Sequence, residues 1–323
     1  MTDGRDTSSL EHAPSGRPAP SAGRGGSFLK GAFATILGVY VLLIGGIIVA
    51  DLIYVSGTKA GHREIKELIF THIPAKAERA ELSRDEQLYF SALQRRRDNL
   101  VHAVWLSVWT SAVAAVISLV IAVPTGYLLS RGRFRGVLFL DALVDIPIVL
   151  PPLLFGISLL VLFTQSGLDD TLASIGMRFV DQPAGIVLVQ VLIATAYGAR
   201  MLKGTFDSID PRQAAVAQTL GCTPTRAFFT VTLSSARNGL IASVVMMWAR
   251  ALALYGPIIA FCGSTSMHTE VMPTRMYLEM SVGRLHAALL IALIMIAMAV
   301  FVLFVLKLVM GRSNDQVGRM LRL

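Results

Sequence analysis

The sequence alternates between long apolar runs and shorter polar segments. Each of six runs is near the length of about 20 apolar residues that crosses a bilayer as an α-helix. A helix is required there, because an unpaired backbone amide or carbonyl in lipid is costly. The pattern predicts an all-α polytopic membrane protein with about six transmembrane helices, at residues 33–54, 101–129, 137–163, 184–199, 240–261 and 287–308.

The third run has two interpretations, because it is interrupted by Pro147, Pro151 and Pro152. It is either one span kinked at the prolines or two half-spans that form a hairpin. The positive-inside rule separates the two. One span leaves the basic loop 200–237 inside and the acidic loop 167–183 outside, whereas a hairpin puts the basic loop outside. We therefore expect one kinked span, with both termini cytoplasmic.

Composition excludes several classes of protein. Of the 323 residues only 15% are charged, against about 25% in soluble proteins, so a water-soluble enzyme is excluded. Two cysteines are too few for a disulfide framework. The net charge of +8 comes mostly from basic residues between apolar runs, which argues against nucleic-acid binding. No phosphate-binding glycine-rich loop and no set of metal ligands occurs, so we expect no bound cofactor, no metal and no catalytic residue.

The most informative polar segment follows the fourth apolar run. Asp210 can cap a helix that Gly221 ends in the left-handed conformation, and Thr223 can cap a second helix that starts with proline. The resulting helix–glycine–helix presents small and aromatic side chains, which are Ala214, Ala217, Phe228 and Phe229. Such a surface suits the docking of a cytoplasmic partner, although an ordinary connector on the membrane surface has the same pattern.

This segment resembles the coupling loop of ATP-binding-cassette importer permeases, in which Glu-Ala-Ala and Ile-x-Leu-Pro flank a glycine at fixed spacing. The glycine, one alanine, the leucine and the spacing agree here, whereas the glutamate and the proline are absent. The resemblance implies that residues 205–236 form an ATPase-coupling loop. Its candidate coupling residues are Ala215, Val216, Ala217, Gly221, Phe228, Phe229 and Leu233.

The resemblance extends over residues 100–310 and is closest to the molybdate/tungstate/sulfate permeases. It is carried by Arg133-Phe134-Arg135-Gly136, Leu140-Asp141-Ala142-Leu143, Pro147 to Pro152, Arg250-Ala251-Leu252, Tyr255-Gly256, Thr269-Glu270, Met272-Pro273, Tyr277-Leu278-Glu279, Gly283 and Ala287-Ala288. It implies a type I importer permease fold and an oxyanion substrate. Permeases for polyamines, ferric ion or phosphonates remain alternatives, and a membrane receptor, a scaffold or an intramembrane enzyme is a more distant one.

The apolar pattern and the charge distribution predict an organisation of the chain, and the resemblance implies a set of partners. We expect a disordered cytoplasmic tail at 1–30, a first transmembrane helix at 31–55, an extracytoplasmic segment at 56–99, a permease core at 100–310 and a cytoplasmic tail at 311–323. The implied partners are two ATP-binding subunits that carry ATP and magnesium, an extracytoplasmic solute-binding protein and a second permease subunit. The implied location is the bacterial inner membrane, with lipid around the spans.

Charged and helix-breaking residues inside the spans indicate a transport path. Arg250 lies about midway along the fifth apolar run, where an unpaired charge is expensive. Asp145 is a plausible partner, and two interpretations stay open: a structural ion pair, or a cation that makes the path favourable for an anion. Arg200, near the end of a span, is expected to extend to the interface. The candidate path residues are Arg250, Asp145, Pro151, Pro152 and Gly256.

Overall fold

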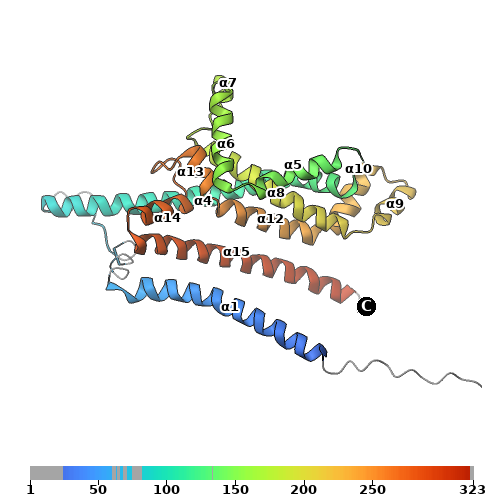
Figure 1. The fold of residues 1–323 in the computed structure, drawn as a ribbon, viewed down its shortest axis with the longest axis horizontal. Helices are drawn as coiled ribbons and strands as arrows, with labels where there is room; N and C mark the ends of the chain where they lie inside the picture. The colour runs from blue at the N-terminus through green and yellow to red at the C-terminus, as the bar shows by residue number, and fades with distance from the viewer. Residues whose placement is uncertain are drawn as a thin grey trace, which may run out of the picture. The chain divides into compact units, whose positions relative to one another are not determined.

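The computed structural model describes residues 25–59, 63, 66–67, 71–74, 82–132 and 134–320. Within these residues the chain is helical and has no β-strand, which confirms the all-α fold (Figure 1). The elements are α1 (Gly25–Gly57), α4 (Arg84–Arg131), α5 (Val137–Val149), α6 (Pro152–Gln165), α7 (Leu168–Ser174), α8 (Pro183–Asp207), α9 (Arg212–Thr219), α10 (Pro224–Ala227), the π-helix η2 (Phe228–Thr232), α11 (Leu233–Ser235), α12 (Arg237–Leu252), α13 (Gly256–Cys262), α14 (Met272–Ser281) and α15 (Leu285–Met320).

Four of the described helices, α1, α4, α8 and α15, are long and apolar enough to cross a membrane. Two bent pairs, α5 with α6 and α10–α11 with α12, bring the number to six if each is one span. This agrees with the expectation of about six spans. Two helices run beyond their expected ends, because α1 begins at Gly25 and α15 continues to Met320, inside the segments expected to be tails.

Helix α4 joins the second predicted span to the polar segment before it, in a single helix of 48 residues. A capping box starts this helix. The hydroxyl of Ser83 accepts a hydrogen bond from the Glu86 amide at 3.4 Å, and the Glu86 carboxylate accepts one from the Ser83 amide at 3.1 Å. The first part of α4 thus lies in the segment 56–99 that was expected to be extracytoplasmic, of which positions 75–81 lie outside the described residues.

The third apolar run is broken rather than kinked. Helices α5 and α6 meet at 109°, which is far beyond an ordinary proline kink and indicates a broken span or a re-entrant pair. The break lies where two prolines adjoin. Pro151 disfavours a helical conformation at Leu150, and Pro152 occupies the first turn of α6, where a missing amide proton costs nothing.

The fifth apolar run is interrupted too, so the single helix expected at 240–261 is wrong. Helix α12 ends at Leu252, and α13 starts at Gly256 with Pro257 in its first turn. The interruption weakens the helical hydrogen bonding of the Ala251 carbonyl. The buried Gln190 amide of α8 donates a hydrogen bond to that oxygen at 3.1 Å. A side chain thus stabilises irregular backbone inside the membrane part.

Helices α4, α8 and α12 run side by side and form the centre of the helical core (Figure 1). Small side chains on α4 allow this, and the buried ones include Ser107, Ser111, Ala114, Ala115, Ser118, Ala122 and Gly126. At Gly126, a Cβ atom would lie 2.8 Å from the Cβ of Leu202 on α8. The backbones of α4 and α8 therefore approach each other closely at Gly126, with no room for a side chain between them.

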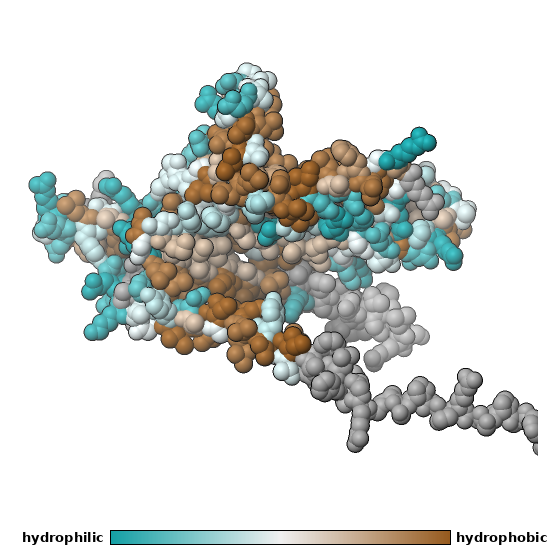
Figure 2. Space-filling model, viewed as in Figure 1, coloured by the Kyte–Doolittle hydropathy of each residue, from teal (hydrophilic) through white to brown (hydrophobic). Residues whose placement is uncertain are grey.

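Helix α6 packs against α13, where Gly156 faces Pro257. The other sides of α5 and α6 carry exposed apolar side chains, among them Leu138, Phe139 and Val149, which are 81%, 74% and 79% exposed. Figure 2 shows this hydrophobic surface over both helices. Such a surface requires lipid or another protein subunit to cover it.

Candidate functional site: coupling loop and charged span residues

The coupling loop folds as the sequence predicts. Asp210 accepts a hydrogen bond from the Arg212 amide at 2.9 Å where α9 begins, and the Thr223 hydroxyl accepts one from the Arg226 amide where α10 begins. Between them Gly221 adopts φ +92°, the left-handed conformation. The amides of Cys222 and Gly221 donate to the carbonyls of Ala217 and Gln218 at 3.1 and 3.0 Å, which is a Schellman helix end.

The coupling loop presents an apolar surface to solvent. Val216 is 58% exposed, Leu220 80% and Phe229 60%, and Ala215 is exposed as well. Ala217 and Leu233 are half-buried. Because these side chains lie on a cytoplasm-facing element outside the spans in the predicted topology, their exposure is consistent with a surface that a partner covers.

Phe228 differs from the expectation that both phenylalanines point outward. Its ring contacts Tyr127 edge-on, with centroids 4.7 Å apart, and also the fully buried Phe206 at 6.5 Å. Consecutive residues on a helix point about 100° apart, so Phe228 can face the core while Phe229, its neighbour on the helical segment, stays outside. Phe228 is therefore the anchor of the coupling loop on α4 and α8.

Arg131 provides a second anchor for the coupling loop. Its guanidinium donates hydrogen bonds to the carbonyls of Phe206, at 2.7 Å, and Ile209, where α8 ends. A cation at the carbonyl end of a helix is electrostatically favourable. Between this arginine and α9 lies a cavity of about 210 Å³ lined by Tyr127, Asp210, Gln213, Ala214, Gln218 and Val231 among others. The loop thus contacts the core at its two ends rather than along α9.

Arg250 does not pair with Asp145, the partner that the sequence made plausible. Arg250 donates a hydrogen bond to the Tyr197 hydroxyl at 2.8 Å, and its guanidinium carbon lies 4.5 Å from the centre of the same ring. A hydrogen bond and a cation–π contact therefore hold this cation on α8. The sequence indicates how deep in the membrane Arg250 lies, from its position along the span. It does not indicate which neighbouring helix the side chain faces.

Asp145 instead belongs to an ion cluster between α5 and α8. Its carboxylate accepts from Nε of Arg200 at 3.0 Å, and a second Arg200 nitrogen pairs with the other oxygen. Arg200 also contacts Asp141 at 3.0 Å, and Lys203 contacts Asp141 at 3.1 Å. Arg200, which was expected to extend to the interface, thus pairs with two carboxylates of α5. Its two partners lie four residues apart and thus on one face of α5.

The remaining path candidates meet where both broken segments adjoin. Pro151 and Pro152 separate α5 from α6, and Gly256 begins α13. A Cβ atom at Gly256 would lie 3.5 Å from the Leu153 amide, directly after these prolines. The structure therefore brings three predicted path residues together, whereas Arg250 and Asp145 have separate partners.

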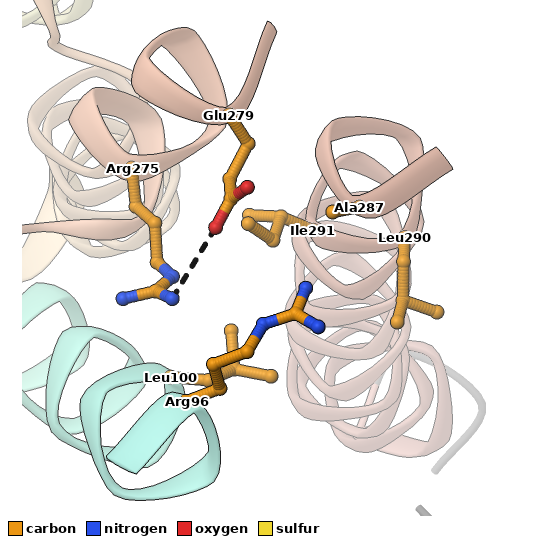
Figure 3. A pocket seen from close by; sticks show the side chains of 7 residues that line it. All are labelled: Arg96, Leu100, Arg275, Glu279, Ala287, Leu290 and Ile291. Carbon is orange, nitrogen blue, oxygen red and sulfur yellow. Dashed lines mark hydrogen bonds and ion pairs between the residues drawn. The ribbon is translucent and has the colours of Figure 1, made fainter. Parts of the chain in front are cut away.

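A second charged group, centred on Arg275, has no counterpart among the predicted site residues. Arg275 bonds Glu270 at 2.9 Å and Glu279 at 3.4 Å, and all three side chains are nearly buried. Figure 3 shows Arg275 and Glu279 of α14 beside a small cavity that Arg96 of α4 and Ile291 of α15 also line. In the sequence, the spacing of four residues between Arg275 and Glu279 was the one feature that could have predicted this ion pair.

The Arg250 geometry leads to a test by double-mutant cycles. We expect Arg250→Gln and Asp145→Asn to act additively on thermal stability in detergent, because their partners differ. The contacting pair Arg200→Gln with Asp145→Asn should show a coupling energy of about 0.5–3 kcal/mol. Purified variants and both doubles are compared by their melting temperatures. A coupling as large for Arg250 with Asp145 as for Arg200 with Asp145 would contradict the structure.

Comparisons with known proteins agree with this architecture. A family described as "Binding-protein-dependent transport system inner membrane component" matches residues 118–316. The molybdate/tungstate transport system permease protein WtpB of Pyrococcus furiosus is 30% identical over 218 residues, 67% of this chain and 80% of that protein. The molybdenum transport system permease protein ModB of Escherichia coli is 30% identical over 220 residues, 67% of this chain and 96% of that protein.

Solved structures show the same fold. A chain from the crystal structure of a bacterial alginate ABC transporter, in complex with its alginate-bound periplasmic protein, has a TM-score of 0.57 at 15% identity. The match covers 88% of this chain and 98% of that chain. The family match and the relatives at 30% identity confirm the resemblance to importer permeases. The chain belongs to the family of inner-membrane components of binding-protein-dependent transport systems, the permeases of ATP-binding-cassette importers.

Proposed function

We propose that this permease imports a tetrahedral oxyanion, molybdate or tungstate, with sulfate as the related substrate of the same shape. The assignment of the substrate rests on the 30% identity to permeases named for molybdate and tungstate, across about two thirds of the chain. A cation inside a span, Arg250, is compatible with an anionic substrate. The polyamine and ferric-ion alternatives would require the path to carry cations past this group.

The chain itself performs no covalent chemistry in this proposal. Two ATPase subunits bind ATP and magnesium, and the exposed surface of the coupling loop, with Val216, Leu220 and Phe229, docks on them. Closure of the ATPases displaces this loop. The anchors at Phe228 and Arg131 carry the displacement into α4 and α8, because side chains packed at van der Waals distance move as one body. The permease then alternates between inward- and outward-facing states.

The same mechanism requires three further features. A solute-binding protein delivers the oxyanion on the extracytoplasmic side, and a second permease subunit completes the path. The apolar surface of α5 and α6 is the kind of surface that such a subunit or lipid covers. The coupling loop and both termini are cytoplasmic, in agreement with the excess of basic residues in loop 200–237.

The proposal is tested by uptake in cells that lack their own molybdate importer. We expect the permease, expressed with its ATPase and its binding protein, to accumulate radioactive molybdate at submicromolar concentration. Excess tungstate should compete, whereas a polyamine, ferric ion or a phosphonate should not. An ATPase that lacks its phosphate-binding lysine is the control for energy coupling. Uptake of a cation, or of a phosphonate in preference to molybdate, would refute the substrate.

A further inference from the structure

Four charged side chains form one ion cluster between α5 and α8: Asp141, Asp145, Arg200 and Lys203. Two carboxylates and two cations give it no net charge. The side chains of Asp141 and Lys203 are each 24% exposed, that of Asp145 is 34% exposed and that of Arg200 is 37% exposed. The cluster is therefore paired internally and still open on one side.

The open side of this ion cluster is expected to face water or protein rather than hydrocarbon. Arg200 lies seven residues before the end of α8, about 10 Å inside the helix end that leads into the coupling loop. Charged groups near the end of a span pair with one another, line water-filled space or extend to the interface. Gly204 supplies a second observation, because a Cβ atom there would meet nothing within 4 Å. One turn after Arg200, this face of α8 is thus not covered by the described part of the chain.

The buried side of α8 is the opposite one. Leu202 and Phe206 are fully buried in the α4–α8–α12 core. Arg200, Lys203 and Gly204 share the other face, since residues three and four apart lie close together on a helix. Tyr197, which holds Arg250, lies one turn deeper on α8. A row of cations therefore follows α8 from the middle of the membrane part toward the coupling loop.

We infer that the ion cluster lines the cytoplasmic end of the transport path, and that Arg200 and Lys203 form an exit site for a dianionic oxyanion. The inference rests on the proposed function. Guanidinium and ammonium groups bind tetrahedral oxyanions through charge-assisted hydrogen bonds. Asp141 and Asp145 occupy these donors when no substrate is present. Their competition keeps the exit site weak, so the anion is released rather than retained.

Cysteine labelling tests where the path lies without using any substrate. Gly204→Cys is made in a chain whose Cys222 and Cys262 are replaced by alanine, and Phe139→Cys is the matched control. Phe139 is 74% exposed but lies two residues before Asp141, on the opposite side of α5. The complete transporter, in inside-out vesicles, is treated with an impermeant maleimide, with or without a non-hydrolysable ATP analogue and magnesium.

We expect the cysteine at position 204 to react rapidly without nucleotide and at least fivefold more slowly with the analogue, which closes the cytoplasmic end. The cysteine at position 139 should react slowly in both states. Equal rates at position 204 in the two states would overturn the inference, because they would place Gly204 in interfacial water outside the path. A rate at 204 as low as that at 139 would overturn it as well.

Calorimetric titration of the purified transporter with molybdate, without binding protein, tests the exit site. Asp145→Asn removes one competing carboxylate and should raise the affinity at least tenfold, whereas Arg200→Gln should remove detectable binding. Unchanged affinity in Asp145→Asn would overturn the exit site. Failure of the proposed function looks different: the wild-type protein would import no molybdate, while labelling at position 204 would still depend on nucleotide.

Discussion

Replacing Gly156 with leucine should leave almost no folded protein in the membrane. A Cβ atom at this position would lie 2.6 Å from both the Cα and the carbonyl oxygen of Pro257, and 3.0 Å from the Cβ of Ala260. Two of these contacts are backbone atoms, which cannot rotate away. Leucine improves helix propensity by less than about 1 kcal/mol, whereas overpacking costs about 1–3 kcal/mol or more. The cost of the clash therefore exceeds the gain in helix propensity, and the substitution destabilises the fold.

The measurement is the amount of monodisperse protein extracted from membranes with a mild detergent. Gly46→Leu on α1 is the matched control, because a Cβ atom at Gly46 meets nothing within 4 Å. Gly156→Ala should give an intermediate yield, since alanine adds only the first clashing atom. Wild-type yield of Gly156→Leu would show that α6 and α13 do not pack as described.

Replacing Gly221 with valine should reduce uptake at least tenfold and leave the amount of protein in the membrane unchanged. Gly221 has φ +92°, a conformation that costs a β-branched residue about 1–3 kcal/mol. No atom lies within 4 Å of a Cβ atom built there, so the effect comes from the backbone and not from a clash. Strain at the Schellman end of α9 reorients Val216 and Leu220, the exposed surface of the coupling loop.

Gly221→Asn is the informative control for this prediction, because asparagine tolerates the left-handed conformation better than other residues with a side chain. It should retain most of the uptake. Basal ATP hydrolysis of the complex should be similar in both variants, while its stimulation by the loaded binding protein should be lost in the valine variant. Equal uptake by wild type and Gly221→Val would contradict the assignment of this segment as the coupling loop.

Apolar runs determined much of the fold in advance. A span of about 20 apolar residues has few alternatives to a membrane helix, so α1, α8 and α15 were predictable from composition alone. The coupling loop was predictable for another reason. Asp210, Gly221 and Thr223 act through their own neighbouring backbone, and such local signals do not depend on what packs around them.

Partners across helices were not predictable, because a position along the sequence gives the depth of a side chain but not its direction. Arg250 faces Tyr197, and Asp145 is taken by Arg200, a residue assigned to the interface from its place near a span end. Which of the consecutive residues Phe228 and Phe229 faces the core depended on how their helical segment packs on α4 and α8.

The sequence by itself therefore determined the membrane class, the number of apolar segments and the helix–glycine–helix of the coupling loop. The tertiary structure alone decided that the third run breaks by 109° and that its charges pair with α8. Prolines permit both a kink and a break, and the choice depends on what the freed helix packs against. Here Gly156 lets α6 meet the backbone of α13, and that contact exists only once segments 100 residues apart come together.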